Sequence, residues 1–419
     1  MKPRPVPWAL LAVALGASCT LNLAGKRDVS SGSSGGAGAT ATTATMSTES
    51  SASGVTIGSG GSGGSSASSS AASSSSSSSG GGPVWTRRRE LDLDCGFDTQ
   101  VDDFAVLVLL KTDRIDYAAT RSKGEDLRFT TAANKPLDHE IERWVEDGVS
   151  IVWVRVPTIN RAGPTHTKIR MYYSNPGADD VQNPQGIWKS TYEGVWHLSQ
   201  ADNALADSTG KSPLAKNHGS TSGASIVGDG RSFVAASSQY IDTLNDVNVK
   251  RYTVEAFVKG KHDAMTGSGP NGALMRQRNY QIMWDHINPF VAAASLNTND
   301  TDAMGQNWKV SSFDGLAGGT WYYLAATFEG NKLNAYKDGA PTGTKSFGMT
   351  DPQAEPATAK IGRHATDSDA ANFFDGMIDE VRISNKVRSD DWIRAQNKSM
   401  RDDGFVGFGT EEKGSFSLP

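Results

Sequence analysis

Cysteine is almost absent from this sequence, and aromatic residues are missing from a long part of it. The 419 residues include two cysteines, too few for a disulfide-rich scaffold or a four-thiolate zinc site. Neither sign of charge dominates, since 41 Lys and Arg oppose 46 Asp and Glu, and this balance excludes a nucleic-acid binder held mainly by a basic field. No aromatic residue lies between Trp8 and Trp85. Only the chain beyond Trp85 can therefore bury a large core, and its length suits one large domain or two.

The N-terminus has the pattern of an export signal. Two basic residues among the first four precede an apolar stretch, 8–17, which is too short to span a bilayer. Residues 15–19 resemble the lipobox of bacterial lipoproteins, with Gly16 where that motif prefers leucine. The resemblance implies that residues 1–19 are a signal peptide and that Cys19 carries a lipid. Ordinary secretory cleavage nearby is the alternative.

A segment of low complexity follows. Residues 29–82 contain 22 Ser and 13 Gly among 54, with Glu49 as the only charge. Such a composition cannot offset the entropy of ordering the backbone, so we expect residues 20–83 to be a disordered linker. As a flexible coil it would span roughly 45 Å. A lipid anchor on this spacer predicts an exported protein held at the outer membrane or cell surface.

The block 84–189 has the pattern of an all-β domain. Apolar and charged residues alternate over 89–95, which is typical of a half-buried strand, and we expect Cys95 to be a buried, inert thiol. The runs 104–110, 151–156 and 168–173 predict further half-buried strands separated by turns. Because no helical period is present, we expect a β-sandwich.

Several motifs stand out along this block. They are Trp85-Thr86-Arg87-Arg88, Asp126-Leu127-Arg128-Phe129, Leu137 to Trp144, Val152-Trp153-Val154-Arg155-Val156-Pro157 and Ile169-Arg170-Met171-Tyr172-Tyr173. Together they resemble a bacterial family of unknown function, the DUF2341 domain. The resemblance implies a fold and a setting in exported or surface proteins, but no activity.

The block 190–412 is longer and again β-rich, and we assign residues 413–419 to a tail. A hairpin is expected over 321–337, since Glu329-Gly330-Asn331 supplies the positive φ of a tight turn. The other motifs of the block are Gly194-Val195-Trp196-His197-Leu198, Ala206-Asp207-Ser208-Thr209-Gly210, Tyr252 to Lys259, Trp321 to Gly339, Lys360-Ile361-Gly362-Arg363 and Phe374 to Ile383. With these motifs the block resembles the laminin-G-like, concanavalin A-like jelly roll.

The predicted fold class is therefore all-β, with two β-sandwiches after a disordered N-terminal segment. The jelly-roll resemblance implies a binding module for glycans, proteins or cell-surface polymers, often with calcium. A minority of related sandwiches are glycosidases or lyases.

The sequence offers no clear catalytic constellation. Asp379 and Glu380 are adjacent on an expected strand and should point to opposite faces, so they cannot form a glycosidase dyad by themselves. We expect Asp379 to share its face with Val381, and Glu380 to pair with Arg382. The seven histidines show no metal-ligand spacing, and no nucleophile motif occurs. We therefore expect a protein that is not an enzyme.

Calcium is the cofactor that the jelly-roll resemblance implies. Calcium takes six to eight oxygen ligands, and the first and last strands of this fold often lie side by side. The resemblance therefore implies Asp207 and Asp379 as candidate calcium ligands. A second candidate is the loop 297–302, although we favour a solvated turn there.

Aromatic side chains with polar neighbours are the candidates for sugar binding, because exposed rings stack on pyranose faces. They are Trp284, with its neighbour Asp285, and Trp308, although a tryptophan in a sandwich is more often part of the core. We expect non-catalytic binding of a glycan or of another polymer of the cell envelope or the extracellular matrix. A structural or adhesive surface protein that contacts other proteins is the alternative, and a polysaccharide-active hydrolase is a further one. We expect no nucleic-acid partner.

Overall fold

The computed structural model describes most of the chain beyond residue 83. The described residues are 84–94, 96, 100–162, 165–188, 190–265, 271–276, 278–285, 292–301, 305, 307–353, 356–364 and 372–418. The predicted signal peptide, the linker, Cys19 and Cys95 lie outside them. Among the helices within these ranges, none combines the length and the apolar character needed to cross a membrane.

Two antiparallel sheets form the first sandwich. The first sheet has the order β24-β1-β8-β3-β4, with β25 also paired to β1 and β7 to β8, and the middle sheet has the order β2-β6-β5. The strands of the first sheet are β1 (Val84–Leu93), β3 (Arg128–Thr131), β4 (Pro136–Leu137), β7 (Arg161–Ala162), β8 (Thr165–Tyr173), β24 (Val406–Phe408) and β25 (Glu412–Ser417). Those of the middle sheet are β2 (Val101–Leu110), β5 (His139–Arg143) and β6 (Ser150–Ile159).

Two further antiparallel sheets form the second sandwich. The third sheet has the order β11-β12-β23-β14-β19-β20-β21, with β9 paired to β23, and the fourth has the order β10-β13-β22-β15-β16-β17-β18. The third-sheet strands are β9 (Tyr192–Trp196), β11 (Thr221–Ala224), β12 (Asp229–Phe233), β14 (Arg251–Gly260), β19 (Tyr322–Glu329), β20 (Lys332–Lys337), β21 (Ala340–Ser346) and β23 (Gly376–Ser384). The fourth-sheet strands are β10 (Lys216–His218), β13 (Tyr240–Asp242), β15 (Gly272–Arg276), β16 (Tyr280–Met283), β17 (Ala293–Asn297), β18 (Trp308–Ser312) and β22 (Lys360–Ile361).

Helices are few and short in this all-β architecture, as the sequence predicts. α2 begins after Ser389, whose Oγ accepts a hydrogen bond from the backbone N–H of Trp392 at 3.2 Å and so caps the helix. Trp392 and Ile393 anchor α2 in the same apolar core as the middle sheet. The helices are α1 (Pro184–Trp188) and α2 (Asp390–Arg401), with 3-10 turns at Tyr117–Ala119 and Ala235–Ser237.

The middle sheet buries both of its faces. On one face, His139 of β5 packs against Phe129 of β3, with ring centroids 5.4 Å apart. On the other face, Trp153 of β6 stacks on His197, the residue that follows β9 of the third sheet. The half-buried strands predicted for 104–110 and 151–156 are therefore corrected, because their almost unbroken apolar runs belong to strands covered on both sides.

The central strands of the third sheet are likewise buried on both faces, and alternate residues along them belong to different cores. Tyr323 and Ala325 of β19 belong to the apolar core that contains the middle sheet. Leu324 and Ala326 belong to the core shared with the fourth sheet. The hairpin predicted over 321–337 is confirmed as β19 and β20, with Gly330 at a φ of 55° in the turn.

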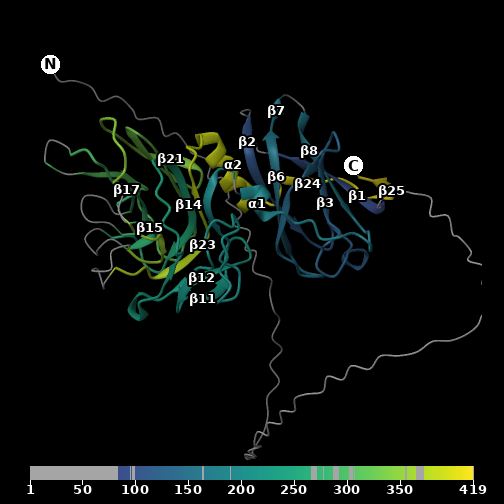
Figure 1. Cartoon of the computed structure of the whole chain (residues 1–419), viewed down its shortest axis with the longest axis horizontal. Coiled ribbons are helices and arrows are strands. Elements are labelled where there is room, and N and C mark those ends of the chain that lie inside the picture. The colour runs from purple at the N-terminus through teal and green to yellow at the C-terminus, as the bar shows by residue number, and fades with distance from the viewer. Residues whose placement is uncertain are drawn as a thin grey trace, which may run out of the picture. The chain divides into compact units, whose positions relative to one another are not determined.

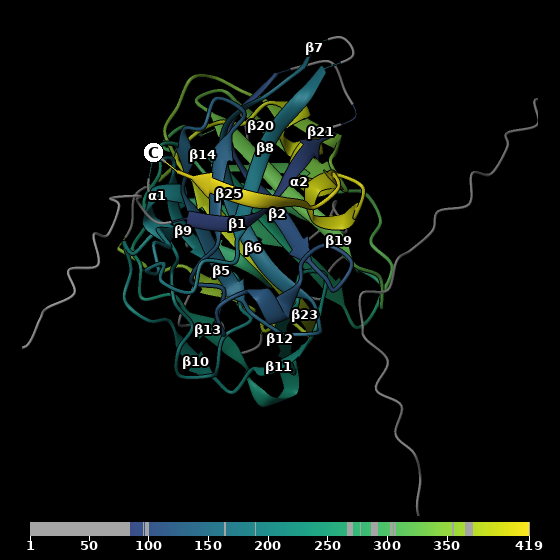
Figure 2. The same cartoon turned by 90° about the vertical axis from the view of Figure 1, so that its right-hand side faces the viewer.

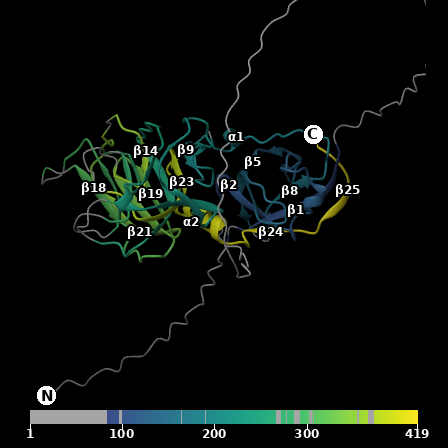
Figure 3. The same ribbon diagram turned by 90° about the horizontal axis from the view of Figure 1, so that it is seen from below.

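The C-terminal strands return to the first sandwich. β24 and β25 both pair with β1, and in Figures 1, 2 and 3 the yellow end of the chain lies beside the blue first strand. An ion pair between Arg87 and Glu411, with an N–O distance of 2.6 Å, supports this return. The tail predicted at 413–419 is thus corrected: Glu412–Ser417 is a strand, because β1 has an edge that needs backbone partners.

His139 predicts how the stability of this fold depends on pH. Its side chain is 2 % exposed, and burial, assisted by the Arg128 charge, lowers its pKa from 6.5 to about 4. The folded chain then binds fewer protons than the unfolded chain between these values. Neutral His139 therefore contributes its full share to the free energy of unfolding above about pH 6.5. We expect this contribution to fall by about 3 kcal/mol as the pH drops from 6.5 through 4.

Urea unfolding of wild type and H139Q at pH 7 and pH 4.5 checks this expectation. The variant should lose about 2–3 kcal/mol less stability than wild type between the two pH values, because glutamine does not titrate. Equal losses in the two proteins would show that His139 is not the group responsible.

Candidate functional site

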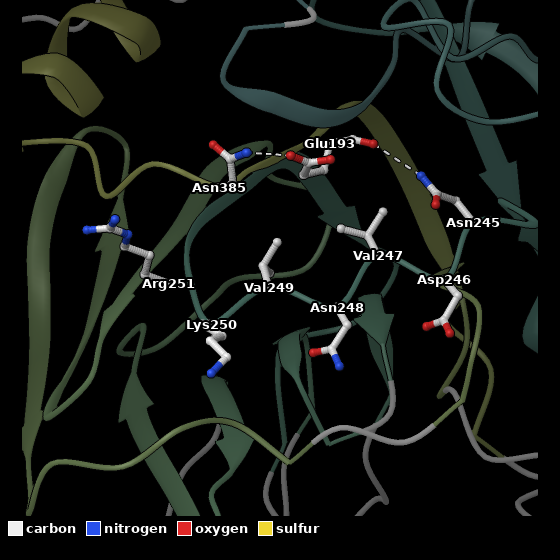
Figure 4. A pocket seen from close by; sticks show the side chains of 9 residues that line it. All are labelled: Glu193, Asn245, Asp246, Val247, Asn248, Val249, Lys250, Arg251 and Asn385. Carbon is white, nitrogen blue, oxygen red and sulfur yellow. Dashed lines mark hydrogen bonds between the residues drawn. The ribbon is translucent and has the colours of Figure 1, made fainter.

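A polar cavity opens between β9, the end of β23 and the segment that precedes β14. Its volume is about 600 Å³. Glu193 and Asn385 lie on one side of the cavity, and the extended segment 245–250 lies on the other (Figure 4). The residues that line it are Glu193, Asn245, Asp246, Val247, Asn248, Val249, Lys250, Arg251 and Asn385.

Alternating side chains position the segment 245–250. Val247 and Val249 are 7 % and 6 % exposed and join the core between the third and fourth sheets. Asp246 and Asn248 are exposed, because successive side chains of an extended chain point to opposite sides. Asn279 fixes the segment by accepting a hydrogen bond from the backbone N–H of Val249 at 3.2 Å.

Hydrogen bonds hold the facing wall of the cavity in place. Asn385 donates from Nδ2 to one carboxylate oxygen of Glu193, and Lys211 donates from Nζ to the other at 3.0 Å. Asn245 donates from Nδ2 to the backbone carbonyl of Glu193 at 3.1 Å, which joins the two walls. Figure 4 shows the bonds that Asn385 and Asn245 make to Glu193. The cavity is therefore a preformed polar site and not a gap between loose side chains.

The charged side chains of the cavity carry both signs. Asp246 is paired with Arg276, whose Nε lies 3.0 Å from Oδ1. Lys250 and Arg251 have side chains that are 81 % and 69 % exposed, and the Nζ of Lys250 lies 2.9 Å from Asp351. The two exposed cations can turn toward a ligand at little energetic cost, because surface ion pairs contribute little to stability.

The structure buries two of the predicted sugar-binding residues. Trp284 is 1 % exposed and donates from Nε1 to the carbonyl of His262 at 3.0 Å. Asp285 is fully buried and accepts hydrogen bonds from the backbone N–H of Met265 and from Nδ2 of Asn271, both at 2.7 Å. The expectation that these residues form a sugar-binding surface is corrected, because both side chains are already satisfied inside the protein.

Trp308 is the predicted aromatic candidate that does present a surface. Its side chain is 42 % exposed, and it lies on β18 opposite Asn297 of β17. It does not line the polar cavity, so the predicted candidates are not brought together in one site.

Asp207 closes a loop against β9. Its Oδ1 accepts hydrogen bonds from the backbone N–H groups of Val195 at 2.9 Å and Thr209 at 3.0 Å, and its Oδ2 accepts from that of Ser212 at 3.0 Å. β9 does lie beside β23, as the fold resemblance implies. Among the described residues, however, no recorded hydrogen bond or ion pair joins Asp207 to Asp379. Calcium at these two positions stays a prediction.

A β-bulge changes the faces of β23. Strand β14 pairs Phe257 with Asp379 and Glu255 with Arg382, so three steps along β23 match two along β14. Glu380 lies at the bulge, and its backbone has a φ of 51°, in the left-handed region that non-glycine residues rarely adopt.

The bulge turns Asp379 toward the middle sheet. Its Oδ2 accepts hydrogen bonds from Oγ of Ser225 and from the backbone N–H of Val227, which belongs to the core of the middle sheet. Val381 instead joins the core shared with the fourth sheet, so the expectation that Asp379 shares its face is wrong. The expected pairing of Glu380 with Arg382 is confirmed, with an N–O distance of 2.5 Å.

Glu380 belongs to a buried centre around His197. The Nδ1 atom of His197 lies 2.8 Å from Oε1 of Glu380 and 3.5 Å from Oε2 of Glu142, and its Nε2 lies 3.5 Å from Oε2 of Glu140. The side chains of His197, Glu142 and Glu380 are fully buried. These three offer ligand atoms within 4.8 Å of one another and are the described residues that can hold a metal ion.

Burial and mutual charge set the protonation of this centre. Burial raises the pKa of Glu142 to about 7, although His197 opposes the shift. Burial, followed by the Glu380 charge, raises the pKa of Asp379 well above its usual value. Burial lowers the pKa of His197, but the carboxylates of Glu380, Glu142 and Glu140 outweigh it and raise that pKa well above 6.5.

Only part of this buried centre could be predicted from the sequence. Glu140 and Glu142 alternate in the strand and so share a face, but nothing in their spacing connects them with His197 or Glu380. The connection arises from sheet packing, which brings residues more than fifty positions apart into contact.

Substitution of Asp285 tests the structural role that the geometry gives it. An amide NH₂ in place of one oxygen would face a donor, either the N–H of Met265 or the amide of Asn271. We expect D285N to lower the free energy of unfolding by about 2 kcal/mol. Urea unfolding measures this, with W308A as the exposed control that should change it by less than about 0.5 kcal/mol. A D285N protein of wild-type stability that had lost glycan binding would instead make Asp285 a ligand-binding group.

Comparison with protein families gives two matches. A model of a domain of unknown function, DUF2341, matches residues 123–202, and the model of the concanavalin A-like lectin/glucanases superfamily matches residues 235–394. The order of a DUF2341 domain followed by a laminin-G-like, concanavalin A-like domain is thereby confirmed. None of the curated proteins compared with the chain matches it.

Solved structures show partial similarity. Domain 4 of AbnA, an extracellular arabinanase from Geobacillus stearothermophilus solved with arabinotriose, is 16 % identical, with 48 % of this chain and 96 % of that chain covered and a TM-score of 0.38. The binding domain of Paraclostridial Mosquitocidal Protein 1 is 10 % identical over 49 % of this chain and 52 % of its own, with a TM-score of 0.36. The ligand-binding domain of Botulinum neurotoxin serotype D, in complex with N-acetylneuraminic acid, is 12 % identical over 51 % and 52 %, with a TM-score of 0.35.

Proposed function

We propose that this protein binds a glycan, without cleaving it, in the polar cavity between Glu193, Asn385 and the segment 245–250. The observation that carries the proposal is a preformed cavity of about 600 Å³ whose lining is dominated by amides and charged groups. A cavity of this size lies within the range of small-ligand sites. Its donors and acceptors suit a ligand covered with hydroxyl groups, and the match to a lectin and glucanase superfamily over 235–394 supports the same ligand class.

The carboxylates of the cavity support binding over hydrolysis. A glycosidase needs one carboxylic acid that gives a proton and a second carboxylate that acts as base or nucleophile. Glu193 is held by Asn385 and Lys211, and Asp246 is paired with Arg276. Both carboxylates are therefore engaged with neighbouring side chains of the protein, which does not suit the acid and base roles of a glycosidase.

Glycan-array binding of the purified full-length protein, with and without Ca²⁺, tests the proposal. We expect N248A and N385A each to weaken binding of the identified glycan by about five- to tenfold, because each removes hydrogen-bonding groups of the cavity. Incubation with that glycan should release no new reducing ends.

W308A is the matched control, since it removes an exposed aromatic outside the cavity. Its affinity should stay within about twofold of wild type. Loss of binding in W308A alone would move the site to β18, and an array without any bound glycan would favour the adhesive, protein-binding alternative.

We further propose that the protein is exported and anchored by a lipid on Cys19, at the outer membrane or cell surface. The short apolar stretch 8–17, the cysteine that follows it and the Ser- and Gly-rich spacer support this location. The spacer would allow the cavity to reach ligands away from the membrane.

Replacement of the cysteine tests the anchor. C19A should remove incorporation of labelled fatty acid and shift the protein from the membrane fraction to the soluble fraction, because the lipid supplies its hold on the bilayer. C95A is the control, and it should remain in the membrane fraction. Continued membrane retention of C19A without label would overturn the lipid anchor.

A further inference from the structure

The buried centre around His197 joins two sheets that lie far apart in the sequence. Glu142 belongs to β5 of the middle sheet, Glu380 belongs to the bulge of β23 in the third sheet, and His197 follows β9. Each of the three side chains has an exposed fraction of zero. The centre therefore lies inside the packed junction of the two sheets, apart from the polar cavity.

Negative groups outnumber positive groups at this junction. Five buried carboxyl groups face three cations: Arg382, His197 and Arg388, whose charge acts on Glu255. If all eight were ionised, the junction would carry two uncompensated negative charges, and an unpaired buried charge is strongly destabilising. The carboxyl groups are those of Glu140, Glu142, Glu255, Asp379 and Glu380.

Three oxygens of the junction also lack a hydrogen-bond partner. Oε1 of Glu142, Oε1 of Glu255 and Oδ1 of Asp379 are buried and accept no hydrogen bond from the described residues. The other oxygen of each group is engaged: Oε2 of Glu142 accepts from Nε1 of Trp153 at 2.8 Å, Oε2 of Glu255 accepts from the Tyr323 hydroxyl, and Oδ2 of Asp379 accepts from Val227 at 2.9 Å. Buried polar atoms without partners in a native protein call for a further group that satisfies them.

The available donors match a transition-metal ion better than calcium. Imidazole nitrogen and carboxylate oxygen are ligands of Zn²⁺ at about 2.0–2.2 Å, so two donors of one ion lie at most about 4.4 Å apart. The three donor atoms lie within 4.8 Å of one another, so small side-chain movements bring them around a single ion. Calcium instead takes six to eight oxygens, which this group does not supply. Trp153, which bonds Glu142, and Arg382, which bonds Glu380, orient the two carboxylates as outer partners do in metal sites.

We propose that Glu142, His197 and Glu380 bind one divalent transition-metal ion, with Zn²⁺ as the preferred occupant, and that this ion fastens the middle sheet to the third sheet. The role is structural, since the three ligands are fully buried and no substrate reaches them. The ion would be acquired as the chain folds, because its ligands come from β5, from β23 and from the residue after β9, which meet only in the folded protein.

Metal analysis of the purified full-length protein is the first test. After refolding with Zn²⁺ and removal of free metal, mass spectrometry should find about one zinc per chain in wild type. Replacement of zinc by Co²⁺ should produce visible d–d absorption bands. Refolding with a strong chelator should lower the midpoint of thermal unfolding by roughly 10 °C, and added Zn²⁺ should restore it.

E142Q is the informative variant, and E255Q is its matched control. Both replace a buried carboxyl group of the same junction by an amide, but Glu255 bonds Tyr323 and stands outside the ligand group. E142Q should lose the zinc and the effect of the chelator on unfolding, whereas E255Q should keep both even if its overall stability falls. Comparing zinc content with unfolding midpoint for each variant separates loss of metal from loss of packing.

The opposite results would overturn the metal site. Wild type that refolds without metal, with an unfolding midpoint unaffected by chelator or Zn²⁺, would show that protons neutralise the carboxyl groups. Equal zinc content in E142Q and wild type would place the ion elsewhere in the chain.

Discussion

The middle sheet is covered on both faces by other sheets, and this constraint governs the structure on both sides of it. Packing between two larger sheets buries Trp153 together with the polar groups around it. Water cannot satisfy those groups, so each must find a partner inside the protein or bind an ion. Trp188 and Trp153 donate to Glu140 and Glu142, and the guanidinium of Arg382 stacks over both rings. The polar junction is thus a consequence of sheet stacking.

The same constraint makes the two sandwiches parts of one compact unit. β1 lies between β8 on one side and the C-terminal strands β24 and β25 on the other. A chain cut at residue 189 would keep the DUF2341-like motifs but would lose these two strands. Asp403 reinforces the return by accepting hydrogen bonds from Lys111 and Arg114, each at 2.8 Å. The first sandwich therefore depends on residues that follow the second in the sequence.

Local pattern was enough to predict a few strands of the second sandwich, namely those whose alternation or turn residues are plain in the sequence. The alternation from Tyr252 to Val258 and the glycine turn at Gly330 depend on neighbours along the chain, and both appear in the structure as expected. The faces of β23 were predicted wrongly, because the alternation of residues 381–384 was extended back through Asp379 and Glu380. The two adjacent carboxylates interrupt that alternation at the bulge, and no glycine stands at the bulge itself. The left-handed backbone at Glu380 is fixed by its tertiary partners, His197 and Arg382.

Site prediction failed for a related reason. Asp285 beside Trp284 looked like a polar surface pair, since an acidic neighbour usually indicates exposure. The carboxylate is instead satisfied by Met265 and Asn271 from a neighbouring loop, contacts that no local pattern reveals. The cavity was missed because its walls combine Glu193 with residues more than fifty positions away, and it contains no aromatic side chain to draw attention.

The cavity and the buried centre share two strands, and this connects binding with stability. On β9, Glu193 lies at the cavity and His197 follows the same strand into the junction. On β23, Glu380 and Arg382 lie in the junction, and Asn385 directly after the strand lines the cavity. β9 and β23 are hydrogen-bonded to each other, so a tightly held junction also fixes the spacing of Glu193 and Asn385. A rigid wall would reduce the entropy lost on binding the proposed glycan, because the protein side of the contact is already ordered.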